Sequence, residues 1–163
     1  MRTLINRCGV IAGPWQMGKV DQGFVALWVA SHIWKKPLSY IGYGGHGKQI
    51  RDILHVEDLF RLVDHELHHM KELNGGVFNV GGGPENTVSL AETTTLCQRI
   101  SGQKIKITGV PKTRKADIRM YVTDASKVKE MTGWQPKKNP EAIVRDVHDW
   151  IKRHARQLEP IFK

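Results

Sequence analysis

Residues 49–70 read QIRDILHVEDLFRLVDHELHHM, and within this stretch a strand pattern gives way to a helix pattern. The first part, 49–55, has the apolar and β-branched content of a short strand. From residue 56 onward, apolar side chains recur at the three- and four-residue spacing of one inward helix face: Leu59, Leu62, Val63, Leu67 and Met70. Asn74-Gly75-Gly76 then ends the helix. A strand that passes directly into a helix is the building unit of α/β domains.

The same alternation of strands and helices extends outward from this stretch in both directions. The sequence predicts strands at 3–11, 38–43, 77–80 and 104–108, and helices at 22–35, 89–100, 124–133 and from 140 onward. Asp21 is the expected cap of the first helix. The fold class is therefore α/β. Because the strands are short and lack a regular βαβ series, they indicate part of a larger architecture and not a complete doubly wound sheet.

The charge of the chain is concentrated in its last third. The 163 residues carry 25 Lys and Arg against 16 Asp and Glu, a net charge of +9. Residues 1–97 are neutral, with nine basic and nine acidic side chains, whereas residues 98–163 carry sixteen against seven. A positive field of this kind suits nucleic acid or a small ligand that carries phosphates.

The length predicts one domain, residues 1–163, with a hydrophobic core. The chain has no apolar run long enough to span a membrane, and its first residues do not resemble a signal peptide. We therefore expect a cytoplasmic protein. Cys8 and Cys97 form no CxxC pair or disulfide framework, and we expect both to be buried thiols.

Two strings match catalytic motifs literally. GYGGHGK at 42–48 fits the dinucleotide pattern GxGxxG and most of the phosphate loop GxxxxGK. However, Gln49 stands where a phosphate loop has Ser or Thr, and the residues that follow favour a strand, whereas both motifs must open a helix. We therefore expect a hairpin-like glycine turn.

The second string, His65-Glu66-Leu67-His68-His69, contains the HExxH spacing of zinc peptidases. Two His four residues apart on a helix can share a zinc ion while the Glu acts as a base. The possible third ligands, Glu85 and Glu92, lie beyond a predicted strand and a glycine run. A solvated helix face is the interpretation we favour, with a zinc-dependent hydrolase as the alternative.

Basic residues beside acidic ones occur in GKQIRD (47–52) and RKADIRMYVTD (114–124). An Arg with a nearby Asp can present its guanidinium to a diphosphate while the carboxylate accepts hydrogen bonds from ribose hydroxyls. The same residues could equally form surface ion pairs of little energetic value. The residue types alone leave both interpretations open.

These strings, together with RCGVIAGPWQMGKVDQG (7–23) and GGVFNVGGG (75–83) followed by SLAE, resemble the C-terminal half of an extended short-chain dehydrogenase/reductase. The resemblance covers essentially the whole chain and is greatest to nucleotide-sugar epimerases of the CDP-paratose 2-epimerase type. It implies the substrate-binding part of a Rossmann-like enzyme that uses NAD. The GxxGxxG loop and the YxxxK pair of the N-terminal Rossmann half are not in this sequence, so we expect the lone chain to be inactive.

The resemblance also assigns roles to individual residues. Those that would lie beside the nicotinamide end of the cofactor are Cys8, Gly9 and Val10. Those that would bind sugar hydroxyls are Gln16, Asp21 and Gln22. Those that would hold the diphosphate and the ribose are Arg51, Arg114, Asp117 and, as an additional phosphate ligand, Arg119. Many relatives place an Asn at the position of Val10.

The expected ligand is a nucleoside-diphosphate sugar, with a CDP-sugar favoured. We also expect the chain to associate with a missing Rossmann half or with a second copy, because the strand at 4–11 would leave its edge uncovered. A basic nucleic-acid-binding module is a further alternative. The last helix argues against it, since acidic residues interrupt its basic ones.

Overall fold

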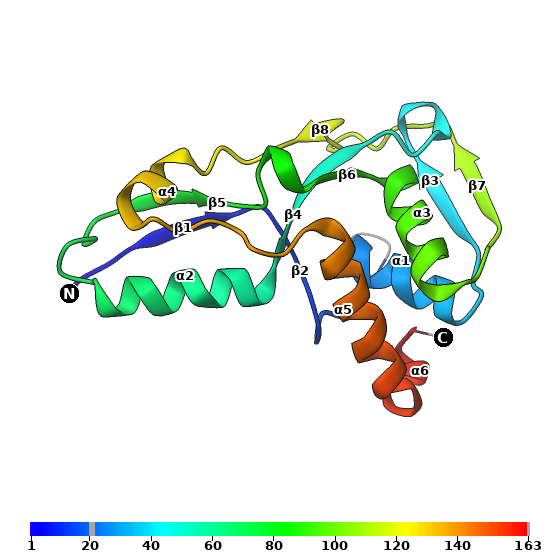
Figure 1. The fold of residues 1–163 in the computed structure, drawn as a ribbon. Helices are drawn as coiled ribbons and strands as arrows, with labels where there is room; N and C mark the ends of the chain where they lie inside the picture. Colours follow the sequence, from blue (N-terminus) through cyan, green and yellow to red (C-terminus); the bar gives the residue numbers. More distant parts are fainter. Residues whose placement is uncertain (20–21, 163) are drawn as a thin grey trace.

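The computed structural model describes residues 1–19 and 22–162, and it contains the expected alternation of strands and helices (Figure 1). The strands are β1 (Ile5–Cys8), β2 (Val10–Ala12), β3 (Leu38–Ile41), β4 (Ile50–His55), β5 (Val77–Val80), β6 (Thr87–Ser89), β7 (Ile107–Val110) and β8 (Met120–Tyr121). The helices are α1 (Phe24–Ile33), α2 (Val56–His68), α3 (Leu90–Ser101), α4 (Ser126–Thr132), α5 (Pro140–Arg153) and α6 (Ala155–Phe162). The class is α/β, as the sequence predicts.

The described strands form three small sheets. β1 and β5 pair in parallel, as do β3 and β7. β4 is the centre of the third sheet: it pairs in parallel with β2 and β8 and antiparallel with β6. The expected strand at 3–11 is therefore two strands that belong to different sheets. The change occurs at Gly9, where a Cβ would lie only 2.8 Å from Thr123 Oγ1.

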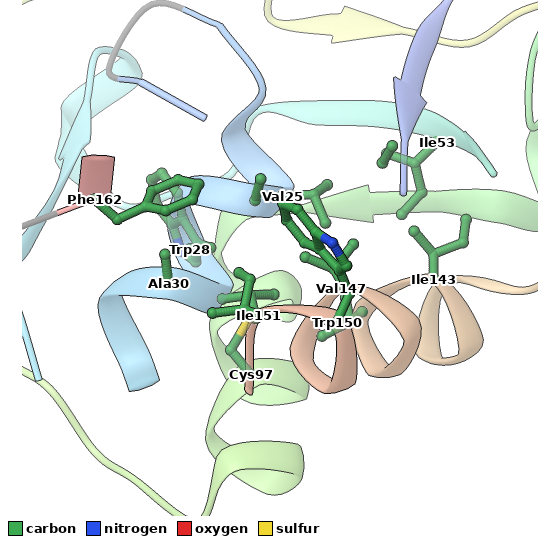
Figure 2. Packing of buried hydrophobic residues seen from close by; sticks show 14 of the residues in the cluster. Val25, Trp28, Ala30, Ile53, Cys97, Ile143, Val147, Trp150, Ile151 and Phe162 are labelled. Atoms are coloured by element: carbon green, nitrogen blue, oxygen red, sulfur yellow. The ribbon is translucent and has the colours of Figure 1, made fainter. Parts of the chain in front are cut away.

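The larger core lies between α1, α3 and α5 (Figure 2). Its buried members on α5 are Ile143, Val144, Val147, Trp150 and Ile151, and those on α1 include Val25 and Trp28. The ends of α3 and α5 follow ordinary capping rules. The Asn139 side chain accepts a hydrogen bond from Ala142 N ahead of Pro140, and Ser89 forms a capping box with Glu92.

A second core lies where α2 covers the β1–β5 pair. Its buried residues are Leu54, Leu62, Leu73, Phe78, Val80, Val128 and Trp134. Helix α2 is confirmed, but the inward face expected for it is only partly right: Leu62 is buried and Leu59 packs against this core. The residues it buries are Asp58, Leu62 and Glu66, whereas Val63 and Leu67 are exposed.

The buried Asp58 explains this rotation of α2. Its carboxylate accepts hydrogen bonds from the backbone of Lys137 (3.0 Å) and Lys138 (3.1 Å) and pairs with Arg61. Its carbonyl accepts a bond from Trp134 Nε1 at 2.9 Å. A carboxylate with this many hydrogen-bond donors is stable inside the protein. Asp58 can therefore lie on the buried face of α2, although its charge would lead a sequence pattern to place it on the surface.

Two smaller expectations also change. Cys97 is buried, and burial raises the pKa of its thiol to about 12, but Cys8 is exposed. Helix α1 begins at Phe24 after Gly23, and Asp21, its expected cap, lies outside the described residues. None of the described helices is both long and apolar enough to cross a membrane.

Candidate functional site

Three segments that are distant in sequence converge around the start of β4. They are the glycine turn 42–47, β4 itself and the segment 111–121 that leads into β8 (Figure 1). Gly42 N donates to Val110 O at 2.8 Å, and Ile50 N donates to Arg119 O at 2.9 Å. The first bond ties the glycine turn to the end of β7, directly before the basic segment, and the second holds the basic segment against the first residue of β4.

The glycine run is a turn, as predicted, but it does not form a hairpin. β3 before it pairs with β7, and β4 after it pairs with β2, so the run carries the chain from one sheet to another. At Gly45, φ is 75°, and a Cβ would lie 2.9 Å from the Gly109 backbone. Glycine at this position allows the turn to contact β7. Because a strand follows, no helix N-terminus is available to bind a phosphate here.

Arg51 and Asp117 form an ion pair at this site. Arg51 Nη2 lies 3.1 Å from Asp117 Oδ1, and the two side chains are only 21% and 25% exposed. Arg51 Nη1 also donates to Ile50 O at 2.8 Å. A guanidinium has five N–H donors, so three remain for a ligand after these two contacts. Partial burial makes these donors more effective toward an anion than those of a fully solvated Arg.

The carboxylate that pairs with Arg51 is not the one beside it in sequence. Asp52 is fully buried, and its Oδ2 accepts a hydrogen bond from Gly83 N at 3.0 Å. Asp52 therefore fixes the three-glycine loop after β5 and cannot contact a ligand from solvent. Neighbouring strand residues point in opposite directions, which separates the roles of Arg51 and Asp52.

Tyr43 joins the turn to the basic segment, and the sequence did not single it out. Its hydroxyl donates to Asp117 O at 2.5 Å, and its backbone N donates to Thr113 Oγ1 at 2.9 Å. Its φ of 49° is uncommon for a residue other than glycine. A tyrosine inside a glycine run was the only sequence signal for this role.

Arg114 and Arg119 lie on the exposed side of the same segment. Asp117 N donates to Arg114 O at 3.1 Å, so a turn places Arg114 close to the ion pair along the chain. Segment 111–121 contains four basic residues, Lys112, Arg114, Lys115 and Arg119, and one acidic residue, Asp117. The site is therefore strongly positive.

The predicted cofactor-side residues lie at the junction of β1 and β2, beside the end of β8. A Cβ on Gly9 would be 3.3 Å from Tyr121 Cε1, so the Tyr121 ring connects this junction to the basic segment. Cys8 is exposed and Val10 is half-buried. The junction and the last residue of the basic segment therefore lie side by side.

The predicted sugar-binding residues lie in the loop between β2 and α1. The Gln16 amide donates to Ile11 O at 2.8 Å, so it stabilises its own loop. Gln22 is exposed and exchanges backbone hydrogen bonds with Lys19 at 2.8 and 3.1 Å. No described contact joins these two residues to Arg51 or Asp117. Asp21 lies outside the described residues.

The HExxH string does not form a metal centre in the described chain. The His65 and His69 rings stack with centroids 4.1 Å apart, but Glu66 points inward and accepts a hydrogen bond from Asn6 at 2.7 Å. Burial raises the pKa of the Glu66 carboxyl. Within residues 1–19 and 22–162, no group of three or more His, Cys, Asp or Glu side chains could hold a metal ion.

Comparisons with known proteins identify relatives of this chain. The family model for GDP-mannose 4,6 dehydratase matches residues 2–147. The chain is 31% identical over 156 residues to CDP-paratose 2-epimerase of Salmonella typhi, a match that covers 92% of this chain and 45% of that protein. It is 28% identical over 166 residues to dTDP-glucose 4,6-dehydratase of Salmonella typhimurium, with 98% of this chain and 43% of that protein covered.

Solved structures of nucleotide-sugar epimerases and dehydratases also match this chain. UDP-glucose 4-epimerase of Thermotoga maritima, with UDP-glucose, superposes with a TM-score of 0.79 at 25% identity and covers 95% of this chain. dTDP-glucose 4,6-dehydratase of Bacillus anthracis, with NAD, gives 0.75 at 26% identity and covers 97%. In both cases the match covers 47% of the other chain. The chain thus spans less than half the length of these relatives.

Proposed function

Because the chain belongs to the GDP-mannose 4,6-dehydratase family of NAD-dependent nucleotide-sugar epimerases and dehydratases, we propose that it binds the nucleoside-diphosphate sugar in such an enzyme. The observation that carries this proposal is the half-buried ion pair between Arg51 of β4 and Asp117 of segment 111–121, which contains four further cations. Arg51, Arg114 and Arg119 would bind the diphosphate. The Asp117 carboxylate would accept a hydrogen bond from the ribose.

The ligand we favour is a CDP-sugar. The support is the 31% identity to CDP-paratose 2-epimerase, a match that includes 92% of this chain. Gln16, Asp21 and Gln22 belong to the loop that would face the sugar, and Cys8, Gly9 and Val10 would face the nicotinamide. The reaction class would then be epimerisation of the sugar.

The complete enzymes of this family use NAD, but the residues described here do not by themselves fit a dinucleotide. Neither glycine run opens an α-helix, since 42–47 leads to β4 and 81–83 leads to a short 3-10 turn. The diphosphate of NAD would therefore lack its usual backbone donors in this chain. We propose that residues 1–163 are the substrate-binding region and that a Rossmann half supplies the cofactor site and the proton-transfer residues.

Titration calorimetry with CDP, UDP, dTDP and inorganic phosphate tests the binding role, and an epimerisation assay with CDP-sugars tests the need for a second half. We expect CDP to bind most tightly and the chain alone to give no turnover. Equal affinity for phosphate and all three nucleotides would refute specific nucleotide binding. Turnover by the purified chain would refute the division between the two halves.

A further inference from the structure

The two outer histidines of the HExxH string are in contact, and the proposed function does not use them. His65 and His69 lie one turn apart at the end of α2, and their rings stack with planes inclined by 20°. Glu66 points away from them to Asn6, so the base that a zinc hydrolase needs is not beside the pair. What remains is a pair of imidazoles on one helix face.

The hydrogen bond of the His69 ring fixes which of its nitrogens is free. His69 Nδ1 lies 2.8 Å from His65 O. Because a carbonyl oxygen can only accept, Nδ1 carries the ring proton and Nε2 keeps its lone pair. Metal-ligating histidines are commonly oriented in this way, with one ring N–H on a backbone carbonyl and the other nitrogen on the ion. His69 is exposed and His65 is half-buried, so an ion in solution can reach the pair.

The separation of the two rings suits a shared ion. Zinc binds imidazole nitrogen at about 2.0 to 2.1 Å, and two such bonds at a tetrahedral angle place their nitrogens about 3.4 Å apart. The ring centroids of His65 and His69 are 4.1 Å apart, which exceeds that separation by less than 1 Å. A small rotation about the side-chain bonds therefore brings both Nε2 atoms onto one ion.

The surroundings of the pair also favour a bound cation. The last turn of a helix carries partial negative charge on its carbonyl groups, and the pair lies on the last turn of α2. His65 lines a cleft of about 270 Å³, which leaves room for water molecules on the ion. Arg61 lines the same cleft, but its contacts with Asp58 and Glu57 offset its charge. Lys137, the other cation of the cleft, is exposed, so that water and salt screen it.

We infer that His65 and His69 chelate a divalent transition-metal ion of the kind that prefers imidazole: Zn²⁺, Ni²⁺ or Cu²⁺. The described residues offer no group of three or more His, Cys, Asp or Glu side chains for a metal, so the ion has two protein ligands and water. It is therefore an exchangeable ion that links two turns of α2, and not the centre of a hydrolase.

The chelate site is independent of the proposed nucleotide site. α2 begins directly after β4, and its 13 residues carry the pair to the opposite end of the helix, about 18 Å away (Figure 1). Binding of the ion therefore tests only the inference about the histidine pair, and it succeeds or fails separately from the binding of CDP.

Calorimetric titration of Zn²⁺ into the full chain, after treatment with EDTA, measures the binding. His65→Ala and His69→Ala should each weaken Zn²⁺ binding at least about tenfold, because a single imidazole cannot chelate. His68→Ala is the matched control. His68 is on the same turn and its side chain is 72% exposed, but its Nδ1 donates to Asp64 O at 2.8 Å and its ring is directed to Asp64. This variant should bind Zn²⁺ as the wild-type chain does.

Urea denaturation gives a second measurement. Zn²⁺ should raise the urea midpoint of the wild-type chain and of His68→Ala, but not that of His65→Ala or His69→Ala, because an ion that binds only the folded chain stabilises it. Mg²⁺, which prefers oxygen ligands, should raise none of them. A variant whose midpoint falls in EDTA is replaced by His69→Gln, which should also lose Zn²⁺ binding. No Zn²⁺ binding by the wild-type chain, or an equal loss in all three Ala variants, would overturn the inference. So would unchanged binding in His65→Ala and His69→Ala, since the ion would then lie elsewhere.

Discussion

Replacing Arg51 by Ala should weaken nucleotide binding far more than replacing an Arg on the surface of α5. Arg51 is held at both Nη atoms, by Asp117 Oδ1 at 3.1 Å and Ile50 O at 2.8 Å. Its remaining donors are therefore oriented before the ligand arrives. Arg153 is exposed, and its Nε donates only to Asp149 O at 3.3 Å within its own helix.

The size of the effect follows from the number and kind of bonds removed. A hydrogen bond to a charged group contributes about 1.5 to 3 kcal/mol, which corresponds to roughly a ten- to hundredfold loss of affinity. Removing Arg51 also leaves the Asp117 carboxylate without this partner, and its negative charge would oppose a diphosphate. We therefore expect Arg51→Ala near the upper end of this range. Arg51→Lys should be intermediate, because an ammonium cannot reproduce the guanidinium fork.

Calorimetric titration of CDP into the variants measures these differences directly. Arg114→Ala should resemble Arg51→Ala, and Asp117→Asn should lose less, since an amide keeps one acceptor for a ribose hydroxyl. Arg153→Ala and Arg156→Ala should change affinity within about twofold, and added salt should remove that change. Equal small effects at all these positions would show that the ion pair is surface charge and would refute the reasoning.

Three further predictions concern the two buried carboxylates of α2 and the tyrosine that positions the site. Asp58→Ala should lower the free energy of unfolding by about 3 to 5 kcal/mol, because two backbone N–H groups and Arg61 lose a buried acceptor. Urea denaturation measures this change, and a value below about 1 kcal/mol would contradict the prediction. Burial raises the pKa of the Glu66 carboxyl above its ordinary value of 4.5. The folded state therefore keeps this proton to a higher pH than the unfolded state does, and the protein loses stability as the pH rises through the folded-state pKa. Glu66→Gln should therefore gain stability over wild type at about pH 8 but not at about pH 4, and a pH-independent difference between the two would refute the assignment. Tyr43→Phe should weaken CDP binding several-fold with little change in urea midpoint, since it removes the hydroxyl bond to Asp117 O, and a loss confined to stability would contradict a positioning role.

The sequence predicts the helices and strands well, but it predicts poorly which strands and side chains pair with one another. Strand β4 and helix α2 were both expected from residues 49–70, because apolar spacing is a local property. The pairing of Arg51 with Asp117 joins residues 66 positions apart, and it exists because β8 pairs with the start of β4. No periodicity reports such a pairing, so residue types alone left a ligand clamp and a surface ion pair equally open.

The partly wrong inward face of α2 has a different physical cause. The apolar pattern of this helix has two faces, and the residues on its buried side include Asp58 and Glu66, which are paired with donors from distant segments. A sequence pattern assigns charged residues to solvent, since it contains no information about those donors.

β4 connects the candidate ligand site to helix α2 without an intervening loop. Arg51 lies near its first residue, and its last residue, His55, accepts a hydrogen bond from Glu57 N at 3.0 Å and so caps α2. Five residue steps of an extended strand span about 17 Å. The strand is held on both sides by β2, β6 and β8, and Asp52, Ile53 and Leu54 within it are fully buried. A ligand bound to Arg51 would therefore lie at a fixed distance and angle from the start of α2.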